Sequence, residues 1–368
     1  MFGDRKLIIL LVALIFVLTL TGYIFFREPV QELATQDSVV NSSEDATIAS
    51  STIVATSSNT VAIGVGASQK TPTASAKSPF LMFKDVGEPF LEHFGLNPND
   101  FQRMKTAGAE VIQGNFDICA SSEDVKYFLD EAKKAGLKTI LPAGSGEAEW
   151  GYPCDGDFGK DLKPQWQKTR VVAWVNKWKY HPALYAWDIS NEAGQNFPNV
   201  DRESSSWEKD FALTLPQLQQ AYKDVKSADP HHPIMIRMNG WYFYDYESNF
   251  FRPGNPFGSN TADIVMINAY SNVDEYFSDF VSTVMSRATK DILSISPQTQ
   301  FIVSLGAWEE PPLWKFPSIA EFSNDLNSAI KTKNLIGVGI FKYGAVGQEW
   351  FLPEHNSLWN FISTLKIK

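Results

Sequence analysis

Near the middle of the 368-residue chain stands the stretch His181-Pro182-Ala183-Leu184-Tyr185-Ala186-Trp187-Asp188-Ile189-Ser190-Asn191-Glu192. Its centre, residues 183–189, is a nearly unbroken apolar and aromatic run between a proline and a polar cluster. Such a run predicts a strand that is buried on both faces, as in a parallel sheet. Glu192 follows the end of this strand, and functional side chains gather at the carboxyl ends of parallel strands.

From Pro79 onward, short apolar runs alternate with longer amphipathic runs, which predicts alternating strands and helices. Asn97-Pro98 predicts a capped helix start, and Ser121 and Gly136 predict the two ends of the next helix. Further helices are predicted over residues 164–179, 215–228, 273–293, 319–331 and 356–364. Strands are predicted at Phe80–Lys84, Ala109–Asn115, Leu137–Pro142, Ala183–Ile189, Pro233–Met238, Ala262–Asn268, Gln300–Leu305 and Ile336–Phe341.

Eight strands that alternate with helices predict an α/β fold, a (β/α)8 or TIM barrel over residues 79–368. An open doubly wound sheet is the alternative. It would usually carry a glycine-rich phosphate loop after its first strand, and the sequence has none there. We therefore expect no dinucleotide cofactor.

The amino terminus predicts a membrane segment. Arg5-Lys6 precede an apolar run over residues 7–26 that is long enough to cross a bilayer. We expect residues 1–27 to be an uncleaved signal anchor with its amino terminus in the cytoplasm, so that the rest of the chain is extracytoplasmic. A cleaved signal peptide, which would leave a secreted protein, is the alternative.

Residues 28–78 predict a flexible linker. Seventeen of residues 35–78 are Ser or Thr, and no aromatic residue occurs between Phe26 and Phe80. Such a segment cannot bury enough apolar surface to offset the entropy of ordering. The expected order is thus a transmembrane helix, a disordered linker and a barrel.

The charge and the cysteines narrow the possible partners. The net charge is −10, of which residues 79–368 carry −9, so nucleic acid and anionic lipid surfaces are not expected partners. The spacing of Cys119 and Cys154 matches no zinc pattern, and no metal is expected. Their two loops follow adjacent strands at one face of the barrel, which predicts a disulfide outside the cytoplasm. Two buried free thiols are the alternative.

The segment from Val171 to Tyr180, together with His181-Pro182, Trp187 and Asn191-Glu192, resembles clan A of the glycoside hydrolases. Within that clan it is similar to the cellulase- and mannanase-like members of family 5. The resemblance implies that Glu192 is the general acid/base and that Asn191 binds the sugar hydroxyl beside the bond being cut. The other interpretation of Asn191-Glu192 is a strand-to-helix cap.

Polar and aromatic residues that follow the other strands predict a carbohydrate site, because aromatic rings stack on sugars while amides and acids bind hydroxyls. The candidate substrate-binding residues are Asn115, Trp150, Asn239, Trp241, Asn268, Tyr270, Trp308 and Tyr343. By contrast, periodicity favours a packing role for Trp174, Trp178, Trp187 and Trp359.

The seventh strand departs from the family pattern. The resemblance implies a nucleophilic Glu at its end, but the alignment puts Leu305 there, and Glu309 and Glu310 follow later. Glu309 is the candidate nucleophile. Alternatively, Glu309-Glu310 is a solvated loop and the nucleophile comes from elsewhere or is missing.

These observations predict a membrane-anchored, monomeric, extracytoplasmic glycosidase without a cofactor. It would cut β-linked oligo- or polysaccharides by a retaining mechanism. The rival hypothesis is a carbohydrate-binding protein on a hydrolase scaffold that has lost its nucleophile.

Overall fold

The computed structural model describes residues 78–89, 91–146, 148–151, 153–154, 165–192, 213–244, 257–273, 275–344 and 352–365. These residues all belong to one unit, Pro72–Lys368. The predicted membrane segment and all of the predicted linker except its last residue lie outside the described residues. Within the described ranges, no helix has both the length and the apolar character needed to cross a bilayer.

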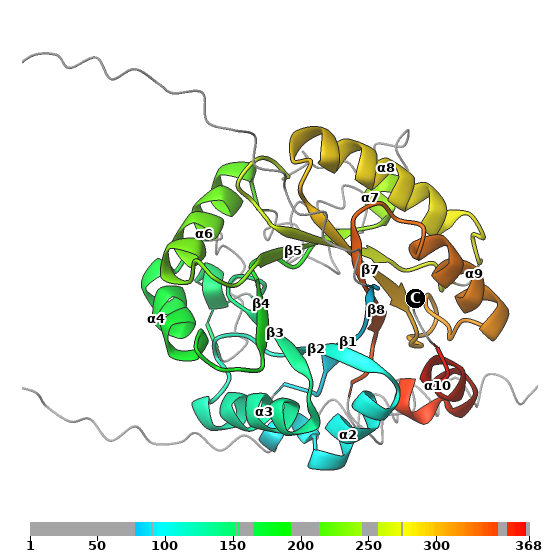
Figure 1. Cartoon of the computed structure of the whole chain (residues 1–368), viewed down its shortest axis with the longest axis horizontal. Coiled ribbons are helices and arrows are strands. Elements are labelled where there is room, and N and C mark those ends of the chain that lie inside the picture. The colour runs from blue at the N-terminus through cyan, green and yellow to red at the C-terminus, as the bar shows by residue number, and fades with distance from the viewer. Residues whose placement is uncertain are drawn as a thin grey trace, which may run out of the picture. The chain divides into compact units, whose positions relative to one another are not determined.

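Eight parallel strands form a closed barrel in sequence order, with β8 hydrogen-bonded to β1 (Figure 1). The predicted parallel barrel is therefore confirmed, and the predicted strands match the observed ones with shifts of up to two residues. The strands are β1 (Phe80–Val86), β2 (Ala109–Gly114), β3 (Lys138–Pro142), β4 (Leu184–Asp188), β5 (Ile234–Asn239), β6 (Ile264–Ala269), β7 (Gln300–Gly306) and β8 (Leu335–Phe341).

Helices surround the strands (Figure 1). The predicted caps are present: Asn97 and Asp100 form a capping box, the Ser121 hydroxyl accepts a backbone N–H, and Gly136 ends its helix at φ 73°. The longer helices are α2 (Pro98–Thr106), α3 (Ser122–Ala135), α4 (Lys168–Trp178), α6 (Leu215–Ala228), α8 (Phe280–Ile295), α9 (Ile319–Ala329) and α10 (Asn356–Ser363); α7 (Trp241–Tyr244) is a single turn.

Two predicted helices begin too early. The helix predicted over residues 164–179 is α4, which starts at Lys168, and the second difference is larger. The pattern predicts a helix from Val273, but α8 starts at Phe280. Val273 instead pairs with Trp314 in an isolated β-bridge, which ties the segment after β6 to the segment after β7. A local apolar pattern cannot reveal a pairing of this kind, because the partner lies far away in the sequence.

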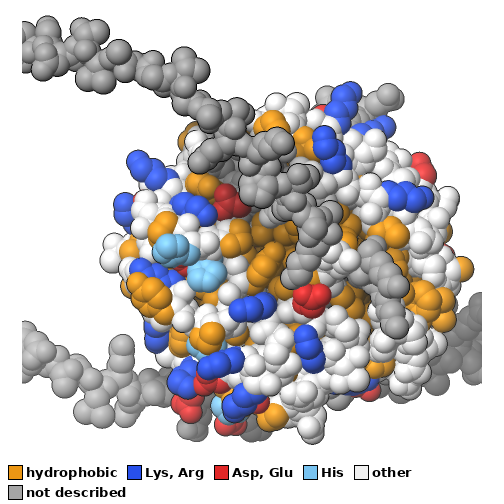
Figure 2. Space-filling model, in the orientation of Figure 1, with side chains coloured by type: hydrophobic (Ala, Val, Ile, Leu, Met, Phe, Trp, Pro, Cys, Tyr) orange, Lys and Arg blue, Asp and Glu red, His pale blue; other side chains and the backbone are white. Residues whose placement is uncertain are grey.

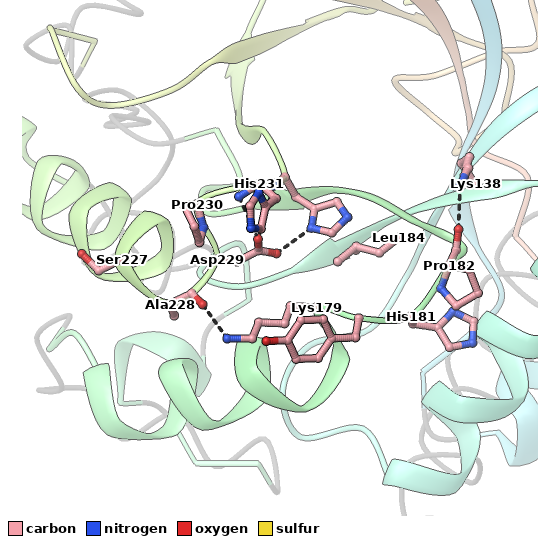
Figure 3. Close-up of a pocket in the computed structure, with 12 residues that line it drawn as sticks. Lys138, Lys179, His181, Pro182, Leu184, Ser227, Ala228, Asp229, Pro230 and His231 are labelled. Carbon is pink, nitrogen blue, oxygen red and sulfur yellow. Dashed lines mark hydrogen bonds and ion pairs between the residues drawn. The ribbon is translucent and has the colours of Figure 1, made fainter.

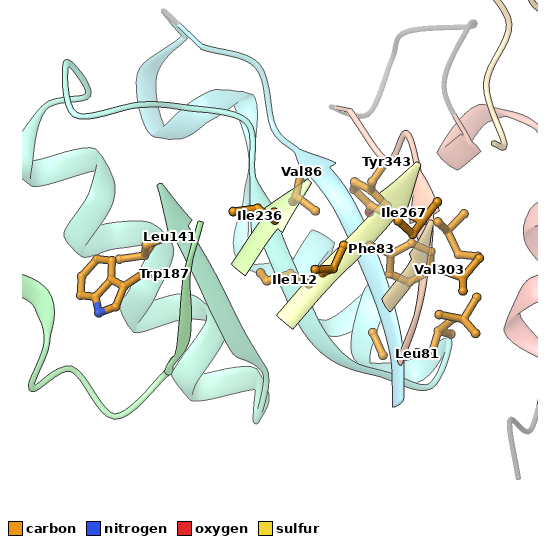
Figure 4. Close-up of a cluster of buried hydrophobic side chains, with 14 of the residues drawn as sticks. Leu81, Phe83, Val86, Ile112, Leu141, Trp187, Ile236, Ile267, Val303 and Tyr343 are labelled. Carbon is orange, nitrogen blue, oxygen red and sulfur yellow. The ribbon is translucent and has the colours of Figure 1, made fainter. Parts of the chain in front are cut away.

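The apolar core has two parts. The larger one lies between the strands and the surrounding helices, and Figure 4 shows members such as Leu141, Trp187, Ile236 and Val303. The predicted packing role of Trp174, Trp178, Trp187 and Trp359 is confirmed, since all four are buried in this part.

The smaller part fills the inside of the barrel. Figure 2 shows hydrophobic side chains at the centre of the face within the ring of strands, with Lys and Arg spread around its rim. This inner layer consists of Phe80, Met82, Val111, Ile140, Ala186, Met235, Ile264, Met266 and Ile302. The barrel is thus a packed core rather than a pore.

Candidate active site

The carboxyl-terminal end of the barrel interior is polar. Six buried side chains each lie two residues after a member of the inner apolar layer, and side chains two residues apart on a strand share a face. Each of them therefore points into the barrel, next to the apolar layer. They are Lys84, Gln113, Asp188, Arg237, Asn268 and Ser304.

Asp188 is fully buried in this polar layer, and its partners include the side chains of Arg237 and Gln113. Arg237 Nε lies 2.8 Å from Asp188 Oδ2, and Gln113 Nε2 donates to the same oxygen over 2.7 Å. Burial raises the pKa of Asp188, and the positive charge of Arg237 opposes that rise. Removal of either partner would leave the other charge buried without compensation, so the two side chains are coupled across β4 and β5 at this end.

Lys84 reaches from β1 to residues at the end of β6. Its Nζ donates to Asn268 Oδ1 over 2.9 Å and to the Tyr270 hydroxyl oxygen over 2.6 Å. Burial lowers the pKa of Lys84 to about 8, although the negative charge of Asp85 acts in the opposite direction. The ammonium group is therefore mostly charged at neutral pH.

Glu192 follows β4 and is half-buried beside this layer. The Asn268 amide donates to Glu192 Oε1, and Asn239 Nδ2 donates to Glu192 Oε2 over 3.3 Å. The backbone of Glu192 has φ 47°, in the left-handed region that residues other than glycine rarely adopt. Residues in such conformations cluster at functional sites, where the surrounding structure holds them in place.

Each of the two amides is oriented toward Glu192 by a hydrogen bond from another donor. The Asn268 carbonyl oxygen accepts from Lys84, and the Asn239 carbonyl oxygen accepts from the backbone N–H of Trp241 over 2.9 Å. An ammonium group and an N–H can only donate, so each amide must turn its NH₂ group to the carboxyl group. The arrangement therefore suits an ionised Glu192, whose two oxygens both accept.

Aromatic side chains form a wall beside Lys84. The Tyr270 ring stacks on Phe341 at a centroid distance of 4.9 Å, and Trp308 lies 4.6 Å from Phe341 and 4.7 Å from Trp314. Tyr270 and Trp308 are buried, whereas Phe341 and Trp314 are half-buried. The two half-buried rings are therefore the better candidates for contact with a sugar, and the sequence analysis missed both.

Two carboxyl groups lie close together near the ends of β2 and β3. A Cβ atom on Gly146 would come within 2.3 Å of Asp117 Cβ and 2.7 Å of Glu149 Oε2, so both side chains pack against this glycine. Burial and the nearby charge of Asp117 raise the pKa of Glu149 to about 8. The backbone N–H groups of Ile118 and of Glu149 itself oppose this rise but do not cancel it. Glu149 is therefore mostly protonated at neutral pH.

A disulfide between Cys119 and Cys154 joins the loop after β2 to the loop after β3, with Cα atoms 5.5 Å apart. Between Gly146 and Cys154 lies the short 3-10 helix η2 (Ala148–Trp150), which contains Glu149. The bond therefore holds the segment that carries the buried carboxyl group.

The structure brings some of the predicted site residues together. Asn239 and Asn268 contact Glu192, and Tyr270 and Trp308 lie in the aromatic wall. Asn191 is exposed beside Glu192, and Asn115 is half-buried in the turn after β2. The binding roles of these residues remain predictions.

Three aromatic assignments need correction or revision. Trp150 is fully buried, its indole N–H donates to Gly144 O over 2.7 Å, and its ring packs on Trp166. Tyr343 is also fully buried, between Phe83 and Trp359 on the outside of the barrel. Neither ring has a free face for a sugar, so both predictions are wrong for this conformation.

Trp241 is the third of these aromatic residues. It is half-buried in α7, where its ring packs on Phe280 of α8 and Tyr244 of α7. Its backbone N–H, through the bond to Asn239, is what connects it to the site. The sugar-binding role of the Trp241 side chain remains a prediction.

Glu309 and Glu310 lie in the segment after β7. Glu309 is half-buried and Glu310 is exposed, and in the described part of the chain neither side chain makes a hydrogen bond or ion pair. The structure therefore describes no contact between Glu309 and Glu192.

A pocket of about 600 Å³ lies at the opposite end of the barrel (Figure 3). It is lined by residues at and before the amino-terminal ends of β3, β4 and β5, among them Lys138, Lys179 and His231. Lys179 donates to Ala228 O over 2.9 Å and Lys138 to Pro182 O over 2.6 Å, so these cations bind carbonyl groups at helix ends and turns. This end of a barrel serves stability, and we do not assign the site to it.

No family model matches the sequence, and no curated protein matches it. A putative alpha-L-fucosidase from Bacteroides thetaiotaomicron aligns at 12% identity with a TM-score of 0.53, over 83% of this chain and 99% of that chain. An endo-1,4-beta-D-mannanase from Thermotoga petrophila aligns at 14% identity with a TM-score of 0.52, over 78% and 100%.

A GH2 beta-galacturonidase from Eisenbergiella tayi aligns at 15% identity with a TM-score of 0.48, over 79% of this chain. The match covers 52% of that protein, so this chain spans about half its length. The likeness to the first two proteins, at 12% and 14% identity, establishes the fold alone. This chain has an eight-stranded parallel (β/α)8 barrel and shares that fold with them.

Proposed function

We propose that the protein is a glycosidase that binds a β-linked oligo- or polysaccharide at the carboxyl-terminal end of the barrel. The observation that carries this proposal is the environment of Glu192. Its carboxyl group is held by two oriented amides, beside a buried charged layer and an aromatic wall. Fixed polar groups next to ring-shaped apolar surfaces suit a sugar.

Glu192 is the proposed general acid/base. To donate a proton it must first take one up. The amide of Asn239 donates to Oε2 over 3.3 Å, a long hydrogen bond that protonation of this oxygen would weaken at little cost. Oε2 is therefore the atom that we assign to proton transfer toward the leaving oxygen.

A retaining reaction needs a second carboxylate about 5–5.5 Å from the first, whereas an inverting reaction uses a gap of about 6.5–9.5 Å. We propose Glu309 for this role, in a retaining mechanism. It lies in the segment after β7 rather than on the strand, so the proposal requires this segment to present the Glu309 carboxylate to the Glu192 carboxyl group.

The remaining features are proposed from the sequence. Residues 7–26 would anchor the chain in the membrane, with the barrel outside the cytoplasm. The Cys119–Cys154 disulfide supports that location, because disulfides persist in oxidising compartments.

The second candidate function is carbohydrate binding without hydrolysis. The observation that favours it is Ser304, which occupies the inward position near the end of β7 and offers no carboxylate. A binding protein would keep the amides and the aromatic wall but would not need a second acid.

A screen of the full chain in detergent against a panel of β-glycans tests both candidates, with Glu192→Gln as the paired variant. We expect the variant to hydrolyse its substrate about 10²- to 10⁴-fold more slowly. Its glycan binding and its melting temperature should stay close to those of the native chain. Full activity in the variant would remove Glu192 from the mechanism, and binding without cleavage by the native chain would favour the second candidate.

A further inference from the structure

The contacts of Lys84 link β1 to Glu192 through a single amide group. Lys84 Nζ donates to Asn268 Oδ1, and Nδ2 of the same amide donates to Glu192 Oε1. Lys84 and Asn268 are 184 residues apart in the sequence, and both side chains are buried. Lys84 itself makes no hydrogen bond to Glu192 among the interactions described.

An asparagine side chain has two nearly isosteric orientations that differ only in which end donates. In one orientation the Asn268 NH₂ group faces Glu192, and in the other the carbonyl oxygen does. The second orientation would set an oxygen against an ionised carboxylate, which is favourable only when Glu192 carries a proton. Lys84 decides between the two, because an ammonium group requires an acceptor and so holds the carbonyl oxygen on its own side.

We propose that Lys84 is a positioning residue that keeps Glu192 ionised between proton transfers by fixing the orientation of the Asn268 amide. This inference rests on the proposed role of Glu192. Lys84 does not touch the substrate in this proposal. It acts through Asn268 and through its positive charge, which lies within the same buried layer as the acidic groups.

The charged and titratable groups that face Lys84 come from several strands. Asp85 is its neighbour on β1, and Asp188, Glu192, Arg237 and Tyr270 come from β4, β5, β6 and the segments that follow them. Burial is the largest influence and lowers the pKa of Lys84 to about 8. The positive charge is therefore present at neutral pH and lost as the pH rises through about 8.

The direct test follows the Glu192 carboxyl carbon by ¹³C NMR in the full chain as the pH is changed. Comparison with Glu192→Gln assigns the resonance. This readout needs no substrate, so it distinguishes a failure of the Lys84 proposal from a failure of the proposed glycosidase function.

In Lys84→Met, the amide is free to turn and the nearby positive charge is absent. We expect the midpoint of the Glu192 titration to move to higher pH by about 1 to 3 units. The matched control is Tyr270→Phe, which removes the other acceptor of Lys84 and leaves the amide contact intact. It should shift the midpoint by much less.

An unchanged midpoint in folded Lys84→Met would overturn the proposal, and so would an equal shift in both variants, which would indicate a general loosening of the site. If Lys84→Met does not fold, Asn268→Ala removes the amide that joins Lys84 to Glu192. The hydrogen bond from Lys84 to Tyr270 remains in this variant. Asn268→Ala should also raise the midpoint, and no shift there would overturn the proposal.

The native chain provides a further measurement without any substitution. As Lys84 loses its charge, the Glu192 resonance should show a second inflection near pH 8. This inflection should be absent in Lys84→Met, and its persistence there would assign it to another group and count against the proposal.

Discussion

Ser304 and Leu305 lie on opposite faces of β7. Leu305 is buried in the apolar layer between the barrel and the helices. Ser304 points into the barrel, and its hydroxyl lies 3.5 Å from the Tyr270 hydroxyl. The sequence alignment that sets Leu305 at the site-facing end of this strand is therefore wrong by one residue, which is enough to exchange the two faces of a strand.

The inward orientation of Ser304 determines which chemical group β7 presents to the site. The inward position near the end of β7 holds a hydroxyl group rather than a carboxylate, and its neighbour Tyr270 accepts a hydrogen bond from Lys84. Strand β7 therefore supplies no carboxylate to the barrel interior at this position. The prediction of Glu309 as the nucleophile concerns the segment that follows β7.

For that segment we predict that Glu309→Ala abolishes cleavage of the best glycan found and that azide or formate restores part of it. A small anion can occupy the space of the missing carboxylate and attack in its place. Glu310→Ala is the matched control, because Glu310 is the exposed neighbour on the same loop. Equal losses in the two variants, or no loss in either, would exclude Glu309 as the nucleophile.

For the disulfide we predict that the double variant Cys119→Ser, Cys154→Ser lowers the free energy of unfolding by about 3–4 kcal/mol, because the bond closes a long loop in the unfolded chain. Urea unfolding under non-reducing conditions measures this. The native chain should show no free thiol after denaturation, since the two cysteines are the only ones in the sequence. Two free thiols, or an unchanged midpoint in the variant, would contradict the prediction.

For Glu149 we predict a pH-dependent contribution to stability. Burial and the charge of Asp117 raise the pKa of Glu149 from 4.5 to about 8, so between these values the folded chain holds a proton that the unfolded chain releases. This contribution is complete below pH 4.5 and is lost as the pH rises through about 8. Its size is on the order of 4 kcal/mol.

Unfolding of the native chain and of Glu149→Gln at several pH values measures this contribution, because Gln carries no titrating proton. The free-energy difference between the two should change between pH 5 and 8, in the sense that the native chain loses stability relative to the variant. Asp117→Asn should keep most of the pH dependence of the unfolding free energy, because burial raises the pKa of Glu149 more than the charge of Asp117 does. A constant difference across this range would show that Glu149 does not bind the extra proton.

The local sequence determined the architecture of this protein. Alternating apolar runs, the Asn97 and Ser121 caps and the stop at Gly136 predicted most of the strands and helices, because each depends on neighbours a few residues away. The polar end of the strand before Glu192 likewise indicated where functional side chains gather.

Only the tertiary structure decided which side chains meet there. The face of β7 that presents Ser304 and the burial of Trp150 and Tyr343 depend on packing partners that are distant in the sequence. The contact from Lys84 through Asn268 to Glu192 exists because barrel closure brings β1, β4 and β6 to one interior. Hydrophobic periodicity reports whether a residue is buried or exposed, and it contains no information about which buried polar groups will become partners.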